Sequence, residues 1–256
     1  MASSPAHDPL PGSDDWQLES CRITVFLTKP LPSESRTWEA FVMEEPEVEV
    51  RSKSDPQSRY IAASPHDLGT ITLRVDGTMT KVDWFVGSVR LHDSPPDDPI
   101  VGPLWENLPA LEDFLRKWIR SSQDSVQRVG LGLVLLGPSH DEKPAAYRCL
   151  APFLPSIVLD PASSDFAYQI NRPRASSTAN VVVNRLSTWS VVRMLDVSLE
   201  SDGRSLRPRS EFRRRTAIDV NTSPEFEAEF DPEAQSPLLM ELFEAALEIA
   251  RTGDRP

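Results

Sequence analysis

Residues 103–138 most constrain what this 256-residue chain can fold into. Apolar residues recur there at steps of three and four, at Leu104, Leu108, Leu111, Leu115 and Trp118. This spacing places them on one stripe of a helix, predicted over residues 104–120, with Pro109 in the first turn of its regular part. The apolar run at 128–138 is short enough for a buried strand. A helix leading into a central strand is therefore the scaffold around which the rest is organised.

Strand patterns flank this scaffold on both sides. Residues 70–75 and 79–86 enclose the dipeptide Asp76-Gly77, which can take the positive φ angles of a tight hairpin turn. Asp202-Gly203 predicts a second hairpin, with arms at residues 191–201 and 204–220. Further strands are predicted at residues 21–31, 47–51, 165–172, 180–186 and 216–221, with a short extended piece at 156–159.

Two further segments have helical spacing. Residues 33–44 form a short amphipathic helix that Ser33 or Ser35 can cap, and residues 236–251 form a last helix with Ser236 as its cap and Pro237 in its first turn. Residues 144–154 form a short helix or turn. Antiparallel strands with few helices indicate an α+β fold: mostly antiparallel sheet or sheets with about three helices. Two similar-sized halves fit this pattern, either sharing a sheet or packed face to face.

The chain divides into three predicted parts. Residues 1–17 are rich in Pro, Ser and Asp and are expected to be a disordered tail. Residues 18–160 form an α+β half that contains the organising helix 104–120, and residues 161–256 form antiparallel strands and a final helix packed on the first half. Trp16, beside the acidic tail, either docks a partner or folds back onto its own domain.

The composition limits the cellular locations expected for this chain. No apolar run approaches the roughly 18 residues of a membrane span, so no membrane is expected. The N-terminus lacks the basic and apolar regions of a signal peptide. The two cysteines, Cys21 and Cys149, have no motif spacing and are expected to be free buried thiols. A cytoplasmic location is the expectation.

The charge of the chain is uneven. A net charge of −12 argues against general nucleic-acid binding, which depends on neutralising phosphates. Residues 172–215 nevertheless hold ten arginines and four acidic residues. Because the arginine fork suits carboxylates and phosphates, a partner or phosphate site is predicted at the arginines of the second hairpin arm. These are Arg204, Arg207, Arg209, Arg213, Arg214 and Arg215.

No motif for catalysis, cofactor binding or metal binding stands out. The four histidines are scattered, and phosphate-loop, dinucleotide and nucleophile-elbow patterns are absent, so no catalytic residue, cofactor or metal is predicted. One alternative acidic site is Asp219 with Asn221, which share one face of a strand and could hold magnesium in a nuclease. The simpler interpretation is a sheet edge, because residues 225–230 alternate charged and apolar side chains.

Several segments, in this order, resemble a sporadically distributed bacterial family of uncharacterised proteins of about this length. The helix LEDFLRKWIRS leads into RVGLGLVLL and later APFLP; AIDVNTS and the final helix LLMELFEAALEIA follow. Arg128, Gly130 and Leu131 match the family's arginine-led strand, although residues 133–135 are Leu-Val-Leu where the family has Tyr-Ile-Asn. Residues 219–221 match its later strand. The resemblance implies a cytoplasmic bacterial protein of the kind found in defence and toxin–antitoxin loci, and it supplies no catalytic residue.

Three functions follow as hypotheses. The first is a non-enzymatic interaction or regulatory subunit that binds a partner protein encoded nearby in such a locus. The second is a metal-dependent nuclease or other phosphoryl-processing enzyme that uses Asp219. The third is an RNA- or nucleotide-binding module that uses the arginine-rich segment, and nucleic acid is not favoured. Self-association is a further expectation, because the acidic cluster at residues 39–49 can pair with a basic face of another copy.

Overall fold

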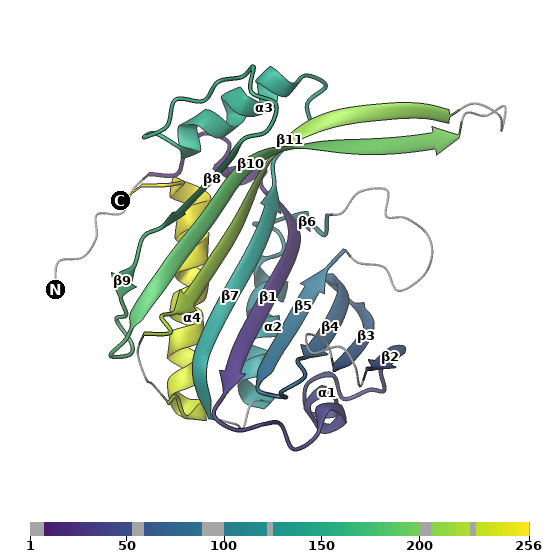
Figure 1. Cartoon of the computed structure of the whole chain (residues 1–256), viewed down its shortest axis with the longest axis vertical. Coiled ribbons are helices and arrows are strands. Elements are labelled where there is room, and N and C mark those ends of the chain that lie inside the picture. Colours follow the sequence, from purple (N-terminus) through teal and green to yellow (C-terminus); the bar gives the residue numbers. More distant parts are fainter. Residues whose placement is uncertain are drawn as a thin grey trace.

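The computed structural model describes residues 8–52, 59–88, 100–121, 125–199, 206–225 and 229–255. These residues build one antiparallel sheet with four α-helices (Figure 1). The strands are β1 Gln17–Leu27, β2 Val48–Arg51, β3 Tyr60–His66, β4 Gly69–Val75, β5 Lys81–Gly87, β6 Gly102–Pro103, β7 Val126–Leu136, β8 Ala167–Asn171, β9 Arg174–Ala175, β10 Val182–Leu199 and β11 Leu206–Thr222. The helices are α1 Glu34–Val42, α2 Leu108–Ser121, α3 Lys143–Leu150 and α4 Pro232–Thr252, with short 3-10 helices η1 Ser13–Asp15 and η2 Ala151–Phe153.

The sheet order reveals two halves with the same topology. Its strands run β2-β3-β4-β5-β1-β7-β11-β10-β8, with β6 beside β1 and β9 beside β10. In each half a first strand (β1 or β7) is followed by a short helix (α1 or α3). Antiparallel strands then return to pair with the first strand, and a long helix (α2 or α4) follows. Because β1 and β7 pair antiparallel with each other, the topology has an approximate twofold at the centre of the sheet.

The predicted α+β class with a mostly antiparallel sheet is confirmed. The two repeats of this topology share the sheet edge to edge and meet where β1 pairs with β7. The described part has four α-helices, which roughly fits the predicted number of about three, and the segment predicted as a short helix or turn holds α3 and η2. No helix in that part is long and apolar enough to cross a membrane.

Side-chain alternation separates the two faces of the sheet. On β1 and β7, Ile23, Leu131 and Leu133 are fully buried against the helix layer. The long helices α2 and α4 lie side by side across this face (Figure 1). Leu111 and Leu115 of α2 are fully buried, as their spacing predicted. The core therefore lies on one side of the sheet, and no long helix of the described residues covers the other side.

The hairpin predictions hold in outline and differ in detail. Around Asp76-Gly77 the turn is wider than two residues: Met79 takes the positive φ of 60°, and the Asp76 carboxylate accepts hydrogen bonds from the backbone N–H of Thr80 and Lys81. The two strands predicted at 180–186 and 191–201 are one continuous strand, β10. It pairs with β11 out to Leu199 and Leu206, so the second hairpin is present, and Asp202-Gly203 lies outside the described residues. The outer part of this hairpin projects beyond the sheet as a two-stranded arm (Figure 1).

The predicted start of the last helix is wrong. The helix begins at Pro232, and the carboxylate of Asp231 caps it by accepting a hydrogen bond from the backbone N–H of Ala234 at 2.8 Å. Ser236 therefore lies within the helix, and Pro237 lies in its second turn. The first turn, from Pro232 to Gln235, has no apolar periodicity. The prediction from apolar spacing therefore placed the start of the helix one turn too late.

The predicted tail is ordered from residue 8 onward. Leu10, Ser13 and Trp16 are buried, so the prediction of disorder is wrong for residues 8–17; residues 1–7 lie outside the described residues. The indole N–H of Trp16 donates to the carbonyl of Ala250 at 2.8 Å, and its ring lies 4.4 Å from the guanidinium carbon of Arg214. Trp16 thus folds back onto its own domain.

Replacing Trp16 tests whether this segment belongs to the core. Trp16→Ala should lower the free energy of unfolding by about 3–5 kcal/mol, because it removes a fully buried indole and its cation–π contact. Urea denaturation measures the change. Val158→Ala is the control, since Val158 is 99% exposed, and it should stay within about 0.5 kcal/mol of the parent. Equal midpoints for both variants would show that the segment does not belong to the core.

Candidate functional site

The face of the sheet opposite α2 and α4 is the candidate functional site, and we call it the open face (Figure 1). It is built from side chains that alternate with the buried core positions. On β1 these are Arg22, Thr24 and Phe26, which share one face because successive strand residues point to opposite sides. The neighbouring strands add Arg74, Lys81, Asp83, Phe85, Arg128, Gly130, Gly132, Arg215, Asp219, Asn221 and Asn184.

Two aromatic rings on the open face each lie beneath an arginine. The guanidinium carbon of Arg128 lies 4.7 Å from the ring centre of Phe26, and that of Arg74 lies 5.9 Å from the ring centre of Phe85. Both rings are only partly buried. In the part of the chain that the structure describes, neither arginine has a carboxylate at ion-pair distance. Two half-exposed rings with cations free of acidic partners are therefore available to a ligand.

Ion pairs hold the other charges of the open face. Arg22 Nη2 lies 2.9 Å from Asp219 Oδ2, and Lys81 Nζ lies 3.1 Å from Asp83 Oδ2. Arg215 Nε lies 3.0 Å from Glu19 Oε2 at the border of the same face. The side chains of Arg22 and Asp219 are 38% and 35% exposed, so this pair meets solvent. Five cations and three carboxylates thus share one surface.

A ladder of amides continues from Asp219 toward the edge of the sheet. Asn221 Nδ2 donates to Asp219 Oδ1 at 2.6 Å, and Asn184 Nδ2 donates to Asn221 Oδ1 at 3.2 Å. Asn171 Nδ2 on β8 donates to Asn184 Oδ1 at 2.9 Å. Each amide fixes the next, so these polar groups have defined orientations before any ligand arrives.

Two glycines of β7 open the centre of this face. Gly132 stands in register between Arg22 on β1 and Asp219 on β11, and a Cβ there would lie 3.5 Å from Arg22 Nε. The Arg22 side chain therefore crosses β7 to reach Asp219. Together with Gly130, this leaves a hollow of about 160 Å³ between Phe26, Arg128 and Asp219.

The predicted arginine site is only partly assembled. Arg204 lies outside the described residues, and Arg207 and Arg209 stand on the projecting arm, opposite Ser198 and Asp196. Arg213 Nε pairs with Glu211 at 2.8 Å, and Arg215 lies on the open face.

Arg214 points the other way, into the core. It is 2% exposed and donates to the carbonyls of Gly12 and Cys149. Burial lowers the pKa of this guanidinium. Arg214 therefore stabilises the fold, and no external partner reaches it in this structure.

The predicted acidic pair is brought together. Asp219 and Asn221 lie two residues apart on β11, on the open face, but both carboxylate oxygens of Asp219 already accept hydrogen bonds. Among the described residues no three His, Cys, Asp or Glu side chains converge. Residues 226–228 lie outside the described part, and Phe230 pairs with Val126 through backbone hydrogen bonds in both directions.

The arginines at the start of the basic segment bind the end of the chain. Arg172 pairs with the buried Asp254, and Arg174 and Arg185 both pair with Glu248 of α4 at 3.1 Å. Much of the charge contrast along the sequence is therefore neutralised within the molecule. Burial raises the pKa of Glu248, but the hydrogen bonds and charges of the two arginines outweigh it, and its pKa lies below the ordinary value.

Sequence reasoning missed the residues at the centre of the open face. Phe26, Phe85, Arg74 and Arg128 lie on four different strands, and only the strand order brings them together. The available signal was the alternation within residues 22–26, where Arg, Thr and Phe take every second position in an otherwise apolar strand.

Comparison with known proteins adds no assignment: the chain matches no known family model and no curated protein.

The Glu248 ion pairs predict an acid-sensitive stability. A carboxylate whose folded pKa is depressed stabilises the fold above its unfolded pKa, and that stability is lost as pH falls. Glu248→Gln should therefore lower the free energy of unfolding at neutral pH and flatten its decline below about pH 4.5. Denaturation at a series of pH values measures both effects. The exposed Glu244 of the same helix gives the control, and Glu244→Gln should keep the parental profile. A parental acid profile in Glu248→Gln would contradict the account.

The Arg22–Asp219 pair predicts a measurable but modest coupling. Arg22→Ala and Asp219→Ala should each cost about 1 kcal/mol or less, because the pair is partly solvated, and a double-mutant cycle should give a favourable coupling of a few tenths of a kcal/mol. Chemical denaturation of the four proteins supplies the cycle. Additive effects would show that the contact does not contribute to stability.

Proposed function

We propose that this protein is a non-enzymatic binding protein, an interaction or regulatory subunit that holds a partner protein on the open face of its sheet. The observation that carries the proposal is the pair of half-exposed rings, Phe26 and Phe85, each beneath an arginine with no carboxylate partner among the described residues. Aromatic residues and arginine are the residue types most enriched in the centres of protein interfaces.

The charge pattern of the open face favours a partner of mixed charge with exposed carboxylates. Arg74 and Arg128 offer two cations, whereas Asp83, Asp219 and Glu19 already accept from cations of the same surface. A partner that brings acidic side chains to these two positions would form bidentate contacts without meeting unpaired negative charge.

The rigidity of this face favours binding as well. Its side chains project from paired strands, and the amide ladder fixes Asn171, Asn184 and Asn221. Preorganised groups lose little conformational entropy on association, so more of the contact energy appears as affinity. A sheet face held in this way suits stable rather than transient binding.

Single-stranded nucleic acid is a second candidate for the same surface. Rings and guanidinium planes can stack on bases, and Phe26 with Arg128 and Phe85 with Arg74 offer two such platforms. Against it, Asp83 and Asp219 share the surface, and the chain carries a net charge of −12. A partner protein therefore has the better electrostatic match.

A magnesium-dependent nuclease has less support. The carboxylate of Asp219 is flanked by the cation Arg22, which opposes a second cation at the same oxygens. The resemblance noted in the sequence favours a partner encoded beside this protein in a defence or regulatory locus of a bacterium, and that location stays a prediction.

The test of the proposal is retention of the partner by open-face variants. The tagged protein is expressed with its genomic neighbours, and the parent is compared with the double variant Arg74→Gln/Arg128→Gln. The amount of partner that the variant retains should be lower than that of the parent by a factor of about ten or more, because both contact cations are gone. Arg148→Gln, on an exposed face of α3, is the matched control and should retain the partner fully.

Two other outcomes decide between the candidates. Equal retention by the double variant would overturn the assignment of the open face. Co-purified nucleic acid that dissociates steeply with rising salt, and that the double variant no longer holds, would establish the nucleic-acid reading instead.

A further inference from the structure

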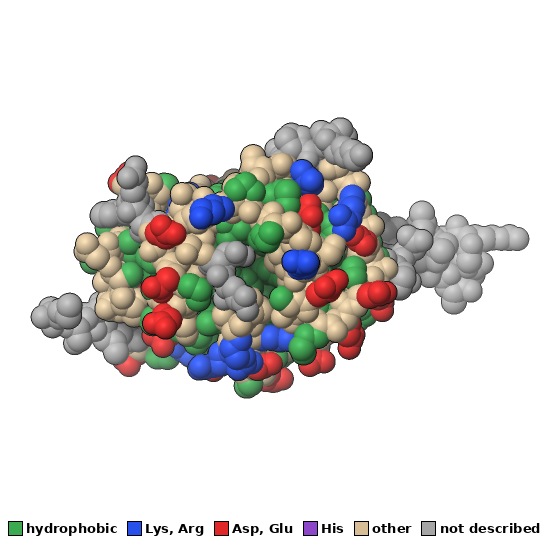
Figure 2. Space-filling view, turned by 90° about the horizontal axis from the view of Figure 1, so that it is seen from below, with side chains coloured by type: hydrophobic (Ala, Val, Ile, Leu, Met, Phe, Trp, Pro, Cys, Tyr) green, Lys and Arg blue, Asp and Glu red, His purple; other side chains and the backbone are tan. Residues whose placement is uncertain are grey.

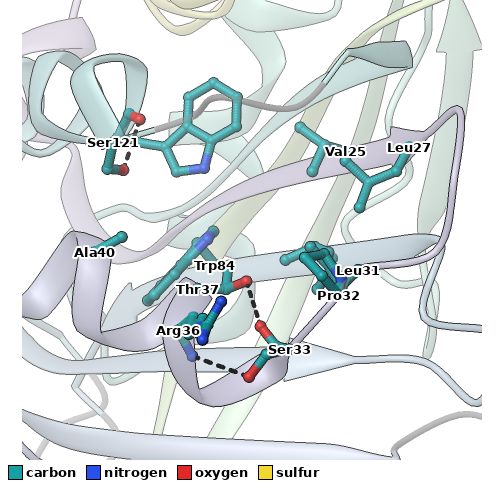
Figure 3. Close-up of a pocket in the computed structure, with 12 residues that line it drawn as sticks. Val25, Leu27, Leu31, Pro32, Ser33, Arg36, Thr37, Ala40, Trp84 and Ser121 are labelled. Atoms are coloured by element: carbon teal, nitrogen blue, oxygen red, sulfur yellow. Dashed lines mark hydrogen bonds between the residues drawn. The ribbon is translucent and has the colours of Figure 1, made fainter.

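A second site lies on the other side of the sheet from the open face, on the helix side of the first half. A hollow of about 250 Å³ opens between α1, the end of β1 and the last turn of α2. Val25, Leu27, Leu31 and Val82 form its apolar wall, and Trp84 and Trp118 complete it (Figure 3). Figure 2 looks onto this end of the molecule and shows hydrophobic side chains around a depression.

Two tryptophans of this hollow have unused hydrogen-bond donors. Four other indole N–H groups donate within the chain: Trp16 to Ala250, Trp38 to Glu44, Trp105 to Ser13 and Trp189 to Ser187. Trp84 and Trp118 are 2% and 3% exposed, and their N–H groups have no acceptor among the described residues. In Figure 3 the indole nitrogen of Trp84 points into the hollow. Neither indole nitrogen is among the fully enclosed unpaired atoms of the described residues, so both N–H groups stay accessible from the hollow to an acceptor from outside the chain.

The polar rim of the hollow is positive. Arg36 is exposed at its edge and has no carboxylate at ion-pair distance within the described residues, and none of the described residues that line the hollow is acidic. Ser33 caps α1 there by accepting from the backbone N–H of Arg36, which places the partial positive charge of the helix start at the same edge. Donors and positive charge, with no carboxylate among the described lining residues, fit an anion.

The second half indicates what shape such a hollow accepts. At the topologically equivalent place, between α3, β11 and the end of α4, the chain inserts its own Trp16. That indole donates to the carbonyl of Ala250 and lies beneath the guanidinium of Arg214. It meets the ring of Phe153 edge to face, with the ring centres 5.2 Å apart. One half thus fills its crevice with an aromatic ring beside an arginine. The other half offers an arginine, two indoles and an empty space.

We propose that this hollow binds a small aromatic carboxylate. Its ring packs against the apolar wall, and its carboxylate accepts hydrogen bonds from the free indole N–H groups and pairs with Arg36. A dry cavity of roughly 150 Å³ holds benzene, so the larger hollow here fits about ten non-hydrogen atoms. This site goes beyond the proposed partner binding, and it uses none of the same residues.

The test uses phenylacetate as the probe, titrated into the full chain. Calorimetry and tryptophan fluorescence should both report binding with a Kd below about 1 mM. Phenylacetamide has the same shape without the charge, and its affinity should be lower by a factor of about ten or more. Arg36→Gln should lower the affinity for phenylacetate by a similar factor and leave the affinity for phenylacetamide unchanged. Arg148→Gln should bind both compounds as the parent does.

A second variant keeps the test independent of electrostatics. Ala40 lines the hollow from an exposed position on α1, so Ala40→Phe should fill it and abolish binding with the fold intact. The open-face variant Arg74→Gln/Arg128→Gln should bind phenylacetate normally, which separates this proposal from the partner proposal. No binding at about 10 mM, equal affinity for acid and amide, or binding that survives Ala40→Phe would each overturn it.

Discussion

The antiparallel pairing of β1 with β7 is the contact on which the rest of the structure depends. It runs from Gln17 opposite Leu136 to Leu27 opposite Val126 and joins the two halves into one sheet. Its register sends Ile23 and Leu131 toward the helices, and Arg22 and Gly132 toward solvent. A slip of one residue would exchange the two faces, burying charge and exposing the core, so hydrophobic burial fixes the register. The open face is thus a consequence of the core rather than a separate feature.

The two halves share a topology but fill it differently. In the second half the N-terminal segment returns to the molecule, and Trp16 covers the guanidinium of Arg214, which would otherwise be a buried cation with little compensation. The carbonyls of Cys149 and Gly12 accept hydrogen bonds from its Nη1 and Nη2, whereas its buried Nε has no partner among the described residues. In the first half no segment of the described chain performs this role, and Trp84 and Trp118 face a hollow. Breaking the internal symmetry in this way leaves one crevice structural and the other available to a ligand.

Local periodicity predicted what depends on neighbours in the sequence. The stripe from Leu104 to Trp118 predicted α2, and the strands around Asp76 predicted a hairpin. Of the two predicted caps of α1, Ser33 and Ser35, the structure uses Ser33. Predictions from local periodicity were wrong where contacts between residues far apart in the sequence determine the structure. Trp16 is ordered by Ala250, more than two hundred residues away, and Arg172 and Arg185 are neutralised by acids at the C-terminal end. For the candidate site, the strand carrying Asp219 and Asn221 was predictable, but Phe26, Phe85 and their arginines meet only through the strand order. Charge excess along a sequence therefore does not by itself define a charged surface.

The central claim is that the open face holds the partner, and side-chain footprinting of the complex tests it most directly. Radical labelling compares the free protein with the purified complex, residue by residue. The account predicts that Phe26 and Phe85 lose reactivity in the complex, while the exposed Val158 keeps its own. Unchanged labelling of both phenylalanines, with protection instead at Leu195 on the projecting hairpin, would contradict the claim and place the partner on the arm.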